Sequence, residues 1–367
     1  MQFMKNSYDS NDVTMLLKDL TGEMKEMSAK ERADAMRSGA HYSEMLPMEN
    51  EPSAEYSRLY EKAMDAKAGE LADEIATVSK MVKDTSNGDT PVLLSLARAG
   101  IPVGILIKRY LEDIYRIKAL HFAISIIRDK GIDENAMEYV YEACIKQGIP
   151  VGKNIIFVDG WTGKGMIHRQ LKEAVATLKE KDKKWDGITD DLYVLADPAN
   201  ITPYCGTHED YMLPCCCLNS TCSGLISRTI LNGYIGESDF HGAVFFEKFS
   251  HMDQSRAFVD TVSSMFKNAS PKIPKETEKE TGMSVVNRVC ADFGVKDFKK
   301  VKPGIGETTR VLLRRVPHMV LLNATADMSD PDIGHILLLC REKGVSVSKY
   351  LLGGYKVCGI IKEAADV

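Results

Sequence analysis

The sequence predicts an α/β protein built on a parallel sheet. Apolar, strand-like runs alternate with helix-like segments through the middle of the chain, a pattern typical of a parallel sheet covered by helices. The expected strands are 91–97, 121–127, 154–158 and 190–196, and the expected helices are 101–114, 133–146 and 164–180. Residues 155–158 are apolar at every position, as in a strand buried on both faces. Ligands of such folds bind at the carboxyl ends of the strands, so a functional site is expected there.

Composition limits the class of protein. The chain has 367 residues, 44% hydrophobic and 27% charged, which is ordinary for a globular protein with room for two domains. No apolar run is long enough to cross a bilayer and no signal-peptide core is present, so a cytoplasmic protein without a membrane partner is expected. The nine cysteines lack the spacing of a disulfide scaffold, which favours reduced thiols.

The first three quarters of the chain are expected to form an arm and a main domain. Residues 1–52 are polar and Met-rich and are interpreted as an N-terminal arm. The main domain is expected at 53–267, beginning with two helices that break near Gly69. Residues 197–250 are rich in Gly, Pro, Cys and His and are expected to form a hood over the site.

A second, smaller domain is expected at 284–367, after a linker at 268–283 that is rich in Pro and charged residues. From 284 onwards there are 13 Lys and Arg against 9 Asp and Glu, a balance of +4 within a net charge of −5, which leaves −9 for residues 1–283. A basic domain on an acidic body indicates a polyanionic partner for that domain.

A glycine-rich turn follows the strand at 154–158. Its glycines permit positive φ and let backbone N–H groups converge on an anion at the start of the next helix. Thr162 can cap the helix or bond a phosphate oxygen, Lys164 adds a positive charge, and Asp159 can accept from ribose hydroxyls. The turn therefore predicts a sugar-phosphate site, with an ordinary capped turn as the alternative. The spacing fits neither a Walker A loop nor a dinucleotide fingerprint.

Other strand ends are polar as well. Arg98 precedes a helix start, an arrangement suited to pyrophosphate. Arg128 has the same potential, although its neighbour Asp129 makes a local ion pair the alternative. Asp197 ends the fourth strand and is a candidate to contact a metal-bound water, or else a turn former.

Several segments carry a resemblance to a known family. LLSLARAGIPVG (93–104), HFAISIIRDKGID (121–133), IIFVDGWTGKG (155–165) and LNSTCSGLISRT (218–229) resemble the phosphoribosyltransferase family of bacterial tellurium-resistance, stress-response gene clusters. HYSEML (41–46) fits as well, so the resemblance covers nearly all of residues 8–260. It implies a type I phosphoribosyltransferase-like fold that uses phosphoribosyl pyrophosphate (PRPP) and Mg²⁺.

The resemblance also implies roles for individual residues. It implies binding of ribose and 5-phosphate by Asp159, Gly160, Thr162, Gly163, Lys164 and Gly165. It implies a pyrophosphate loop at Ala97, Arg98, Ala99 and Gly100. Asp159 and Arg98 are then the expected catalytic residues, because they and Mg²⁺ offset the charges of the transition state. Gly160 stands where type I enzymes usually carry a second acidic residue.

The hood offers a second class of chemistry. Relatives of the family also carry the label StiP cysteine protease, and a thiol nucleophile needs a histidine to activate it. Cys215 with His241 is the expected pair, while Arg228 is a further hood candidate. Buried structural cysteines are one alternative, and zinc bound by the hood cysteines and histidines is another.

The last eighty or so residues resemble the Pelota-type RNA-binding domain, a relative of the L7Ae family with an α/β/α fold. KPGIGETTRVLLRRVPHMVLL (302–322) and LLLCREKGVSVSKYLLGGYKVCGIIK (337–362) carry this resemblance. Glycines can admit an RNA backbone, a carboxylate can accept from a guanine edge, and arginines can face phosphates. The expected RNA-binding residues are Lys302, Gly304, Gly306, Glu307, Thr308, Arg310 and Arg314. Packing or dimerisation is the alternative role of the domain.

The function expected from the sequence is therefore Mg²⁺-dependent transfer of phosphoribose from PRPP to a base-like acceptor, coupled to RNA binding. A non-catalytic, nucleotide-sensing RNA-binding protein and a thiol protease are the alternatives. A homodimer is an expected assembly.

Overall fold

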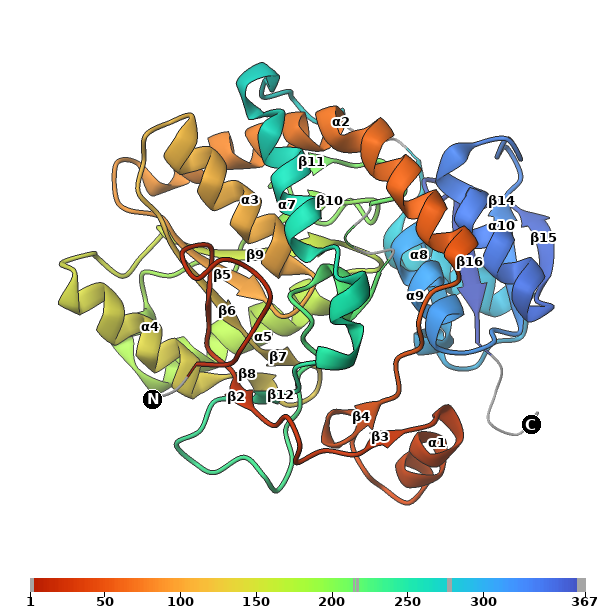
Figure 1. Cartoon of the computed structure of the whole chain (residues 1–367), viewed down its shortest axis with the longest axis horizontal. Coiled ribbons are helices and arrows are strands. Elements are labelled where there is room, and N and C mark those ends of the chain that lie inside the picture. Colours follow the sequence, from red (N-terminus) through yellow and green to blue (C-terminus); the bar gives the residue numbers. More distant parts are fainter. Residues whose placement is uncertain (1–2, 214, 216–217, 276–278, 362–367) are drawn as a thin grey trace.

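The computed structural model describes residues 3–213, 215, 218–275 and 279–361 and shows a mixed α/β protein (Figure 1). In these residues the central sheet has six strands in the order β1-β6-β5-β9-β10-β11, and every neighbouring pair is parallel. The strands are β1 (Thr14–Met15), β5 (Val92–Leu96), β6 (Leu120–Ile124), β9 (Ile155–Trp161), β10 (Leu192–Ala196) and β11 (Cys205–Thr207). The expected parallel sheet is confirmed, and β1 and β11 extend it at its two edges.

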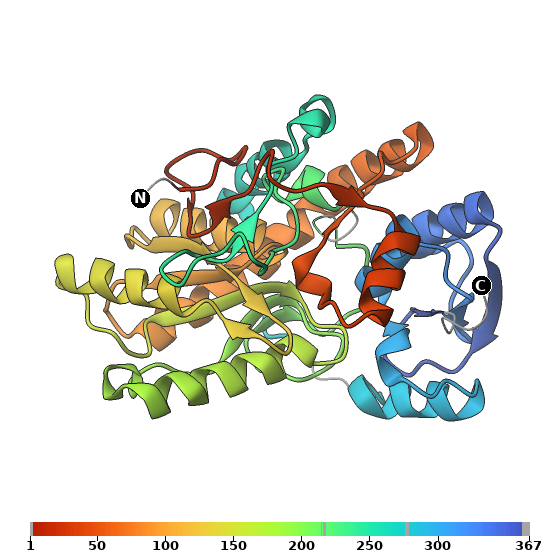
Figure 2. The same cartoon turned by 90° about the horizontal axis from the view of Figure 1, so that it is seen from below.

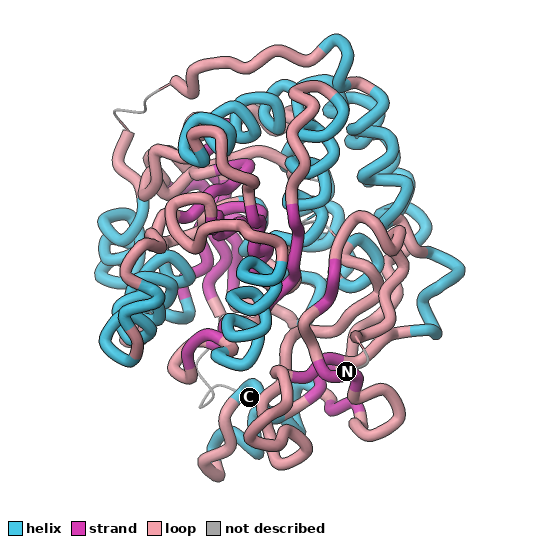
Figure 3. The backbone as a smooth tube through the Cα atoms, turned by 90° about the vertical axis from the view of Figure 1, so that its left-hand side faces the viewer, coloured by secondary structure: helices cyan, strands magenta, loops and turns pink. Residues whose placement is uncertain are grey.

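Helices cover both faces of this sheet (Figure 3). One face packs against α2 (Ala54–Ser86), α3 (Gly100–Asp113) and α7 (Ser255–Ser264), and the other against α4 (Glu134–Lys146) and α5 (Met166–Lys181). Side chains alternate between the two apolar layers along each strand, as the strand period requires. Leu93 and Ile156 lie in the layer of α2 and α3, whereas Leu94 and Phe157 lie in the layer of α4 and α5.

The helix α2 is continuous over 33 residues, so the expected break near Gly69 is wrong. The side chain of Ser53 caps its start, and Asn87 ends it in the left-handed conformation with φ 47°. A glycine inside a helix costs about 1 kcal/mol relative to alanine. Burial of Leu71 and Ile75 on the same helix outweighs that cost, because each fully buried side chain of this size contributes ~1.5–3 kcal/mol.

The N-terminal segment and the hood are interleaved. Besides β1, the N-terminal segment supplies β2 (Lys18–Asp19), which pairs with β12 (Gly242–Ala243) of the hood. It also contains β3 (Glu26–Met27), which pairs with β4 (Leu46–Pro47), and the helices α1 (Ala29–Arg37) and η1 (Tyr42–Glu44). The shorter elements around the hood and main sheet are β7 (Ile126–Ile127), β8 (Gly131–Ile132), η2 (Lys183–Trp185), η3 (Ser220–Cys222), η4 (Glu247–Met252) and η5 (Phe266–Asn268).

The C-terminal domain is a four-stranded sheet between helices, in the order β13-β16-β14-β15. The helix α8 packs on one face, and α9 and α10 pack on the other. Strands β14 and β15 are parallel, whereas β16 is antiparallel to both of its neighbours. Its elements are α8 (Gly282–Asp292), η6 (Phe298–Lys300), β13 (Val301–Pro303), α9 (Ile305–Arg314), β14 (Met319–Asn323), α10 (Pro331–Lys343), β15 (Ser346–Tyr350) and β16 (Val357–Ile360).

The C-terminal domain is docked against the carboxyl edge of the main sheet, and α2 extends far enough to contact α10 (Figure 1). One apolar cluster runs through both parts, from Ile75 on α2 to Ile336 on α10. The Tyr355 hydroxyl donates to the carbonyl of Gly163 at 2.7 Å. The helix α9 therefore faces the strand ends of the main sheet. None of the helices among the described residues is long and apolar enough to span a membrane.

Candidate active site at the carboxyl edge of the sheet

A cavity of about 160 Å³ lies between the carboxyl edge of the main sheet and α9. The turns after β5 and β9 line it from one side, and α9 lines it from the other. It is therefore an interdomain cavity, and it lies at the edge of the sheet where the sequence predicts a functional site. Its charged and hydroxyl-bearing lining residues are Arg98, Asp159, Thr162, Lys164, Glu307 and Arg310.

Two glycines, at the end of β9 and in the turn after it, have close neighbours. A Cβ at Gly160 would lie 3.1 Å from the carbonyl oxygen of Ala99, so a larger residue there would require a small shift of its neighbour. A Cβ at Gly163 would lie 2.8 Å from Cγ of Glu307. The Glu307 side chain thus lies against the turn at which an anionic phosphate was expected, and a carboxylate repels a phosphate.

The polar side chains of this turn already have partners. The Thr162 hydroxyl donates to the carboxylate of Asp197 and accepts from the N–H of Ala199 at 3.3 Å. Lys164 Nζ donates to the carbonyls of Phe298 and Val301 at 3.1 and 2.5 Å. Burial lowers the pKa of Lys164 to about 8, and burial raises that of Asp159 to about 6. Thr162 and Lys164 therefore connect the turn to its surroundings, whereas Asp159 accepts from the N–H of Gly160 at 2.7 Å and lines the cavity.

The turn after β5 is occupied in a similar way. Arg98 is buried and donates to Glu49 Oε1 at 2.5 Å and to the Ile226 carbonyl at 2.7 Å. A Cβ at Gly100 would lie 2.3 Å from the Val158 carbonyl oxygen, so this glycine is needed for the helix to pack on the strand. Arg128 forms the local ion pair considered above, with its Nε 3.3 Å from Asp129 Oδ2. The Arg98 guanidinium therefore joins the turn to the N-terminal arm and the hood.

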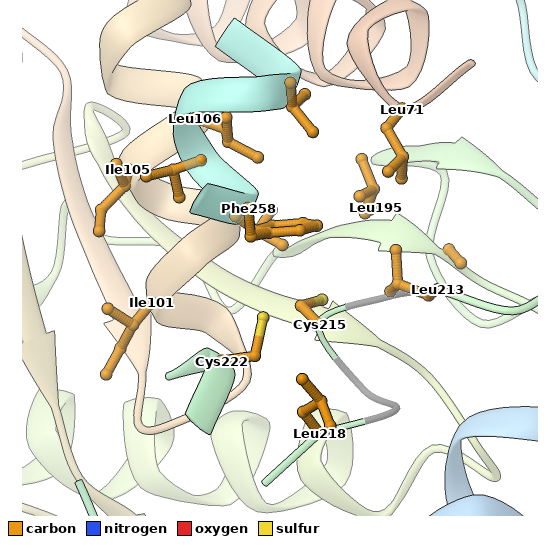
Figure 4. Close-up of a cluster of buried hydrophobic side chains, with 14 of the residues drawn as sticks. Leu71, Ile101, Ile105, Leu106, Leu195, Leu213, Cys215, Leu218, Cys222 and Phe258 are labelled. Atoms are coloured by element: carbon orange, nitrogen blue, oxygen red, sulfur yellow. The ribbon is translucent and has the colours of Figure 1, made fainter. Parts of the chain in front are cut away.

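The expected pair of Cys215 and His241 is not brought together as a catalytic pair. Cys215 lies inside a cluster of apolar side chains, near Cys222 and Phe258 (Figure 4). The His241 ring contacts Ser125 Oγ at 2.9 Å instead, and its backbone N–H donates to Asp133. Burial lowers the pKa of His241. The expected zinc set also included Cys216 and Cys217, which lie outside the described residues.

A different cysteine, on β11, the outer strand next to β10, meets a histidine. Cys205 is the first residue of β11, and its Sγ lies 3.5 Å from Nε2 of His208. Nδ1 of His208 lies 3.1 Å from the Asp197 carbonyl oxygen and 3.5 Å from Asp197 Oδ2. Thiol, imidazole and carboxylate therefore follow one another in the order of a nucleophile, a base and an orienting group.

Asp197 is held firmly in this arrangement. One of its oxygens accepts from Thr162, and the other accepts from the N–H groups of Ile201 and Thr202 at 2.8 and 3.0 Å. Burial raises the pKa of Asp197, while these hydrogen bonds and His208 act against the rise. The pKa of Cys205 is raised to about 12, first by burial and then by the charges of Asp197 and Glu74. In this structure the Cys205 thiol is therefore protonated.

The sequence interpretation missed Cys205. A signal was present, because CGTH (205–208) follows the strand that ends at Asp197. The sequence spacing does not show that His208 lies near Asp197, but the strand register does. Val194 lies opposite Cys205 and Ala196 opposite Thr207, which puts the next residue, His208, beside Asp197. The four cysteines at 215–217 and 222 are a more conspicuous pattern in the sequence than CGTH.

Asp197, Cys205 and His208 also form a set that can hold a metal ion. One ligand atom from each side chain lies within 4.8 Å of the others. Sulfur and nitrogen donors suit Zn²⁺, whereas Mg²⁺ prefers oxygen donors. Asp197 is thus part of a candidate metal set, but of a kind that differs from the expected Mg²⁺ site.

The residues expected to bind RNA lie largely at the domain interface. Gly306 packs against Trp161, since a Cβ there would lie 2.6 Å from the indole. The Arg310 guanidinium lies 4.4 Å from the centre of the Trp161 ring, and Arg314 donates to Asn219 at 3.0 Å. Gly304 begins α9 with φ 86°. The Thr308 hydroxyl donates to the Lys302 carbonyl.

Comparison with known proteins identifies two families. The profile described as tellurite-like stress resistance cysteine protease StiP matches residues 6–263. The profile of the PELOTA RNA binding domain matches residues 280–363. The cysteine protease StiP of Acinetobacter baylyi is 32% identical over 357 residues, which cover 93% of this chain and 90% of that protein.

These comparisons correct the function expected from the sequence. Assignment to a phosphoribosyltransferase family is not supported, and the type I phosphoribosyltransferase-like fold is not confirmed beyond a mixed α/β architecture. The expected transfer of phosphoribose from PRPP to a base-like acceptor is wrong, because both the family match and the curated relative indicate a cysteine protease. The roles in PRPP binding and phosphoribosyl transfer given to Asp159, Arg98 and their neighbouring turns depended on that reaction and are not carried further.

The resemblance to StiP and the Pelota domain, by contrast, is confirmed. The StiP match covers most of the chain and includes the whole central sheet. This protein belongs to the StiP family of tellurite-like stress resistance cysteine proteases and carries a C-terminal PELOTA RNA binding domain.

Proposed function

We propose that this protein is a cysteine peptidase in which Cys205 is the nucleophile, His208 the general base and Asp197 the orienting group. The observation that carries the proposal is the 3.5 Å contact between Cys205 Sγ and His208 Nε2, with Nδ1 of the same ring turned to Asp197. A sulfur nucleophile activated by an oriented imidazole is the arrangement that thiol peptidases need.

The tautomer of His208 follows from its contacts. Because Nδ1 faces two oxygens of Asp197, Nδ1 carries the proton and donates. Nε2 is then free to accept the proton of the Cys205 thiol. The thiolate attacks the peptide carbonyl carbon, the His208 imidazolium protonates the leaving amine as the C–N bond breaks, and water then hydrolyses the thioester.

The described state is a closed one. The Cys205 side chain is fully buried and its thiol is neutral, because burial and the nearby carboxylates raise its pKa to about 12. Catalytic hydrogen bonds are often long before substrate binds. In this proposal, substrate entry admits water and peptide to the site, which lowers the pKa of the thiol and permits transfer of its proton to His208.

The test is cleavage of fluorescently labelled casein under reducing conditions. Wild-type protein is compared with Cys205→Ala and with the matched control Cys144→Ala, which removes a buried thiol from α4. We expect activity in the wild type and the control and none in Cys205→Ala. Activity that survives in Cys205→Ala, or an absence of thiol-dependent cleavage in the wild type, contradicts the proposal.

A second proposal concerns the C-terminal domain, which we propose binds RNA because residues 280–363 match the PELOTA RNA binding domain. Fluorescence anisotropy with a labelled oligoribonucleotide tests this: binding should weaken as salt is raised, because phosphate contacts release counterions. Lack of binding at low salt would refute it. Since a catalytic thiol has to stay reduced, we also propose that the protein acts in the cytoplasm.

A further inference from the structure

Arginine side chains from separate segments meet at the junction of the N-terminal segment, the hood and the C-terminal domain. They are Arg32 on α1, Arg98 after β5, Arg228 in the hood, and Arg314 and Arg315 at the end of α9, and we call them the arginine cluster. Neighbouring charges of the cluster lower the pKa of Arg228 and that of Arg314: Arg32, Arg98 and Arg315 act on Arg228, and Arg98 and Arg228 act on Arg314. Figures 1 and 2 show α1 beside this junction in two perpendicular views.

Few negative charges balance the arginine cluster. Glu49 is a carboxylate bonded to it, through Arg98 at 2.5 Å. The other Glu49 oxygen accepts from the N–H and hydroxyl of Ser220. Among the residues that the structure describes, no carboxylate lies within ion-pair distance of Arg32, Arg228, Arg314 or Arg315. The cluster therefore carries an excess of positive charge in partly desolvated surroundings.

This excess is unfavourable for the protein alone. Burial lowers the pKa of Arg228 to about 10 and that of Arg314 well below its usual range, and the neighbouring arginines act in the same direction. In the described part of the chain, Nε of Arg32 and Nε of Arg314 are enclosed without a hydrogen-bond partner. Charges and donors left in this condition oppose folding unless a ligand compensates them. Arrangements of this kind are concentrated at functional sites.

The geometry favours phosphate over other anions. Guanidinium groups present a planar fork of donors that matches a phosphate, and several of them suit a group with more than one charge. The Arg228 guanidinium lies 4.5 Å from the centre of the Tyr42 ring in a cation–π contact, so this member of the cluster is positioned without a carboxylate. Asn219 Oδ1 of the hood accepts from Arg314 at 3.0 Å and from Arg98 at 3.4 Å, which brings the arginine after β5 and an arginine of the C-terminal domain together.

We propose that the arginine cluster binds a ligand that carries phosphate groups and at least two negative charges. Bound there, this ligand joins the N-terminal segment, the hood and the C-terminal domain. The phosphates come either from RNA, since Arg314 and Arg315 lie within the matched RNA-binding domain, or from a free polyphosphate compound. The site includes neither Cys205 nor His208, so the proposal is independent of the peptidase proposal.

The test is calorimetric titration of the full chain at constant ionic strength with two probes: sodium tripolyphosphate, and a 5′-phosphorylated single-stranded oligoribonucleotide. The variants Arg228→Gln and Arg314→Gln remove one charge each but keep a hydrogen-bonding side chain. The matched controls are Arg169→Gln and Arg341→Gln, whose arginine side chains are 57% and 72% exposed outside the cluster. We expect the cluster variants to raise Kd about tenfold or more, as loss of a charge-assisted hydrogen bond predicts, and the controls to leave it nearly unchanged.

Thermal melting separates loss of binding from misfolding. Without ligand, Arg228→Gln and Arg314→Gln should melt at or above the wild-type temperature, because each relieves repulsion within the cluster. If both probes bind and compete with each other, a free polyphosphate is sufficient to occupy the site. If the oligoribonucleotide alone binds, the phosphates are those of RNA. Two results overturn the proposal: neither probe binds the wild type at millimolar concentration, or the cluster and control variants weaken binding equally.

Discussion

Cys205 and Cys215 both lie in the hood segment and both are fully buried, yet their surroundings differ. Cys205 contacts the His208 ring, which in turn faces Asp197. Cys215 lies among apolar side chains that include Leu213, Leu218 and Phe258, as Figure 4 shows. Burial by itself therefore does not distinguish a structural thiol from a candidate nucleophile. The distinction lies in whether an oriented base is within reach of the sulfur.

The largest expected effect comes from removing the nucleophile. Cys205→Ala should abolish peptidase activity, with a loss of at least ~10⁴-fold in kcat, as for other covalent nucleophiles. Cys215→Ala should retain activity, because that sulfur has a packing role. Rates of casein cleavage by the two variants show which of the two cysteines is the nucleophile. The reverse result would identify Cys215 as the nucleophile and would contradict the distinction between the two thiols.

Removing the base or its orienting group should have the next largest effect. His208→Asn and Asp197→Asn should each lower kcat by ~10²–10⁴-fold, because proton transfer from the thiol is lost or misdirected. His241→Asn should have little effect, since the His241 ring contacts Ser125 rather than a candidate nucleophile. Steady-state kinetics of the three variants measures this. Equal losses in His208→Asn and His241→Asn would refute the assignment of His208 as the base.

A smaller effect is expected from Glu74, whose buried carboxyl has a pKa raised to about 8 and accepts from the Tyr211 hydroxyl at 2.5 Å. Because the pKa of this carboxyl is higher in the folded than in the unfolded protein, the group favours folding at pH values below its unfolded-state pKa. That contribution to stability is lost as the pH rises to about 8. Glu74→Gln should therefore make the free energy of unfolding less dependent on pH between about 4.5 and 8. Denaturant melts at several pH values test this, and an unchanged slope would contradict it.

The same substitution sharpens the comparison of the thiols, because the Glu74 charge helps to raise the pKa of Cys205. Above pH 8, Glu74→Gln should accelerate alkylation of Cys205 and leave that of Cys144 unchanged, since burial alone raises the pKa of Cys144. Mass spectrometry after timed exposure to iodoacetamide measures both rates in one sample. Equal acceleration at both cysteines would indicate general loosening of the fold instead.

The smallest effect is expected at Cys222, whose Sγ lies 3.4 Å from the Tyr60 hydroxyl in the apolar cluster. Cys222→Ser keeps a partner for Tyr60 but puts a hydroxyl among apolar groups, so it should destabilise the protein by about 1–2 kcal/mol. Thermal melting should show a drop of a few degrees while peptidase activity at 25 °C is unchanged. A loss of activity without a loss of stability would assign Cys222 a chemical role.

The elements of the main sheet were well predicted from the sequence, and their ends were not. The strand expected at 154–158 continues to Trp161, because Asp159 and Trp161 pair with β10. A polar residue followed by glycine indicates a strand end locally, but pairing with a neighbouring strand overrides that signal. The Cys205 site was missed for a related reason, since the β10–β11 register places His208 near Asp197.

The sequence by itself determined the parallel sheet, the small C-terminal domain and the resemblance to StiP and Pelota, because strand patterns and long motifs are local properties of the chain. Tertiary structure alone decided which groups from separate segments meet: Arg98 with Glu49, Glu307 with Gly163, and His208 with Asp197. The physical reason is that the strength of a charge, a hydrogen bond or a nucleophile depends on its distance to a partner and on its burial. Both are set when segments far apart in the sequence pack together.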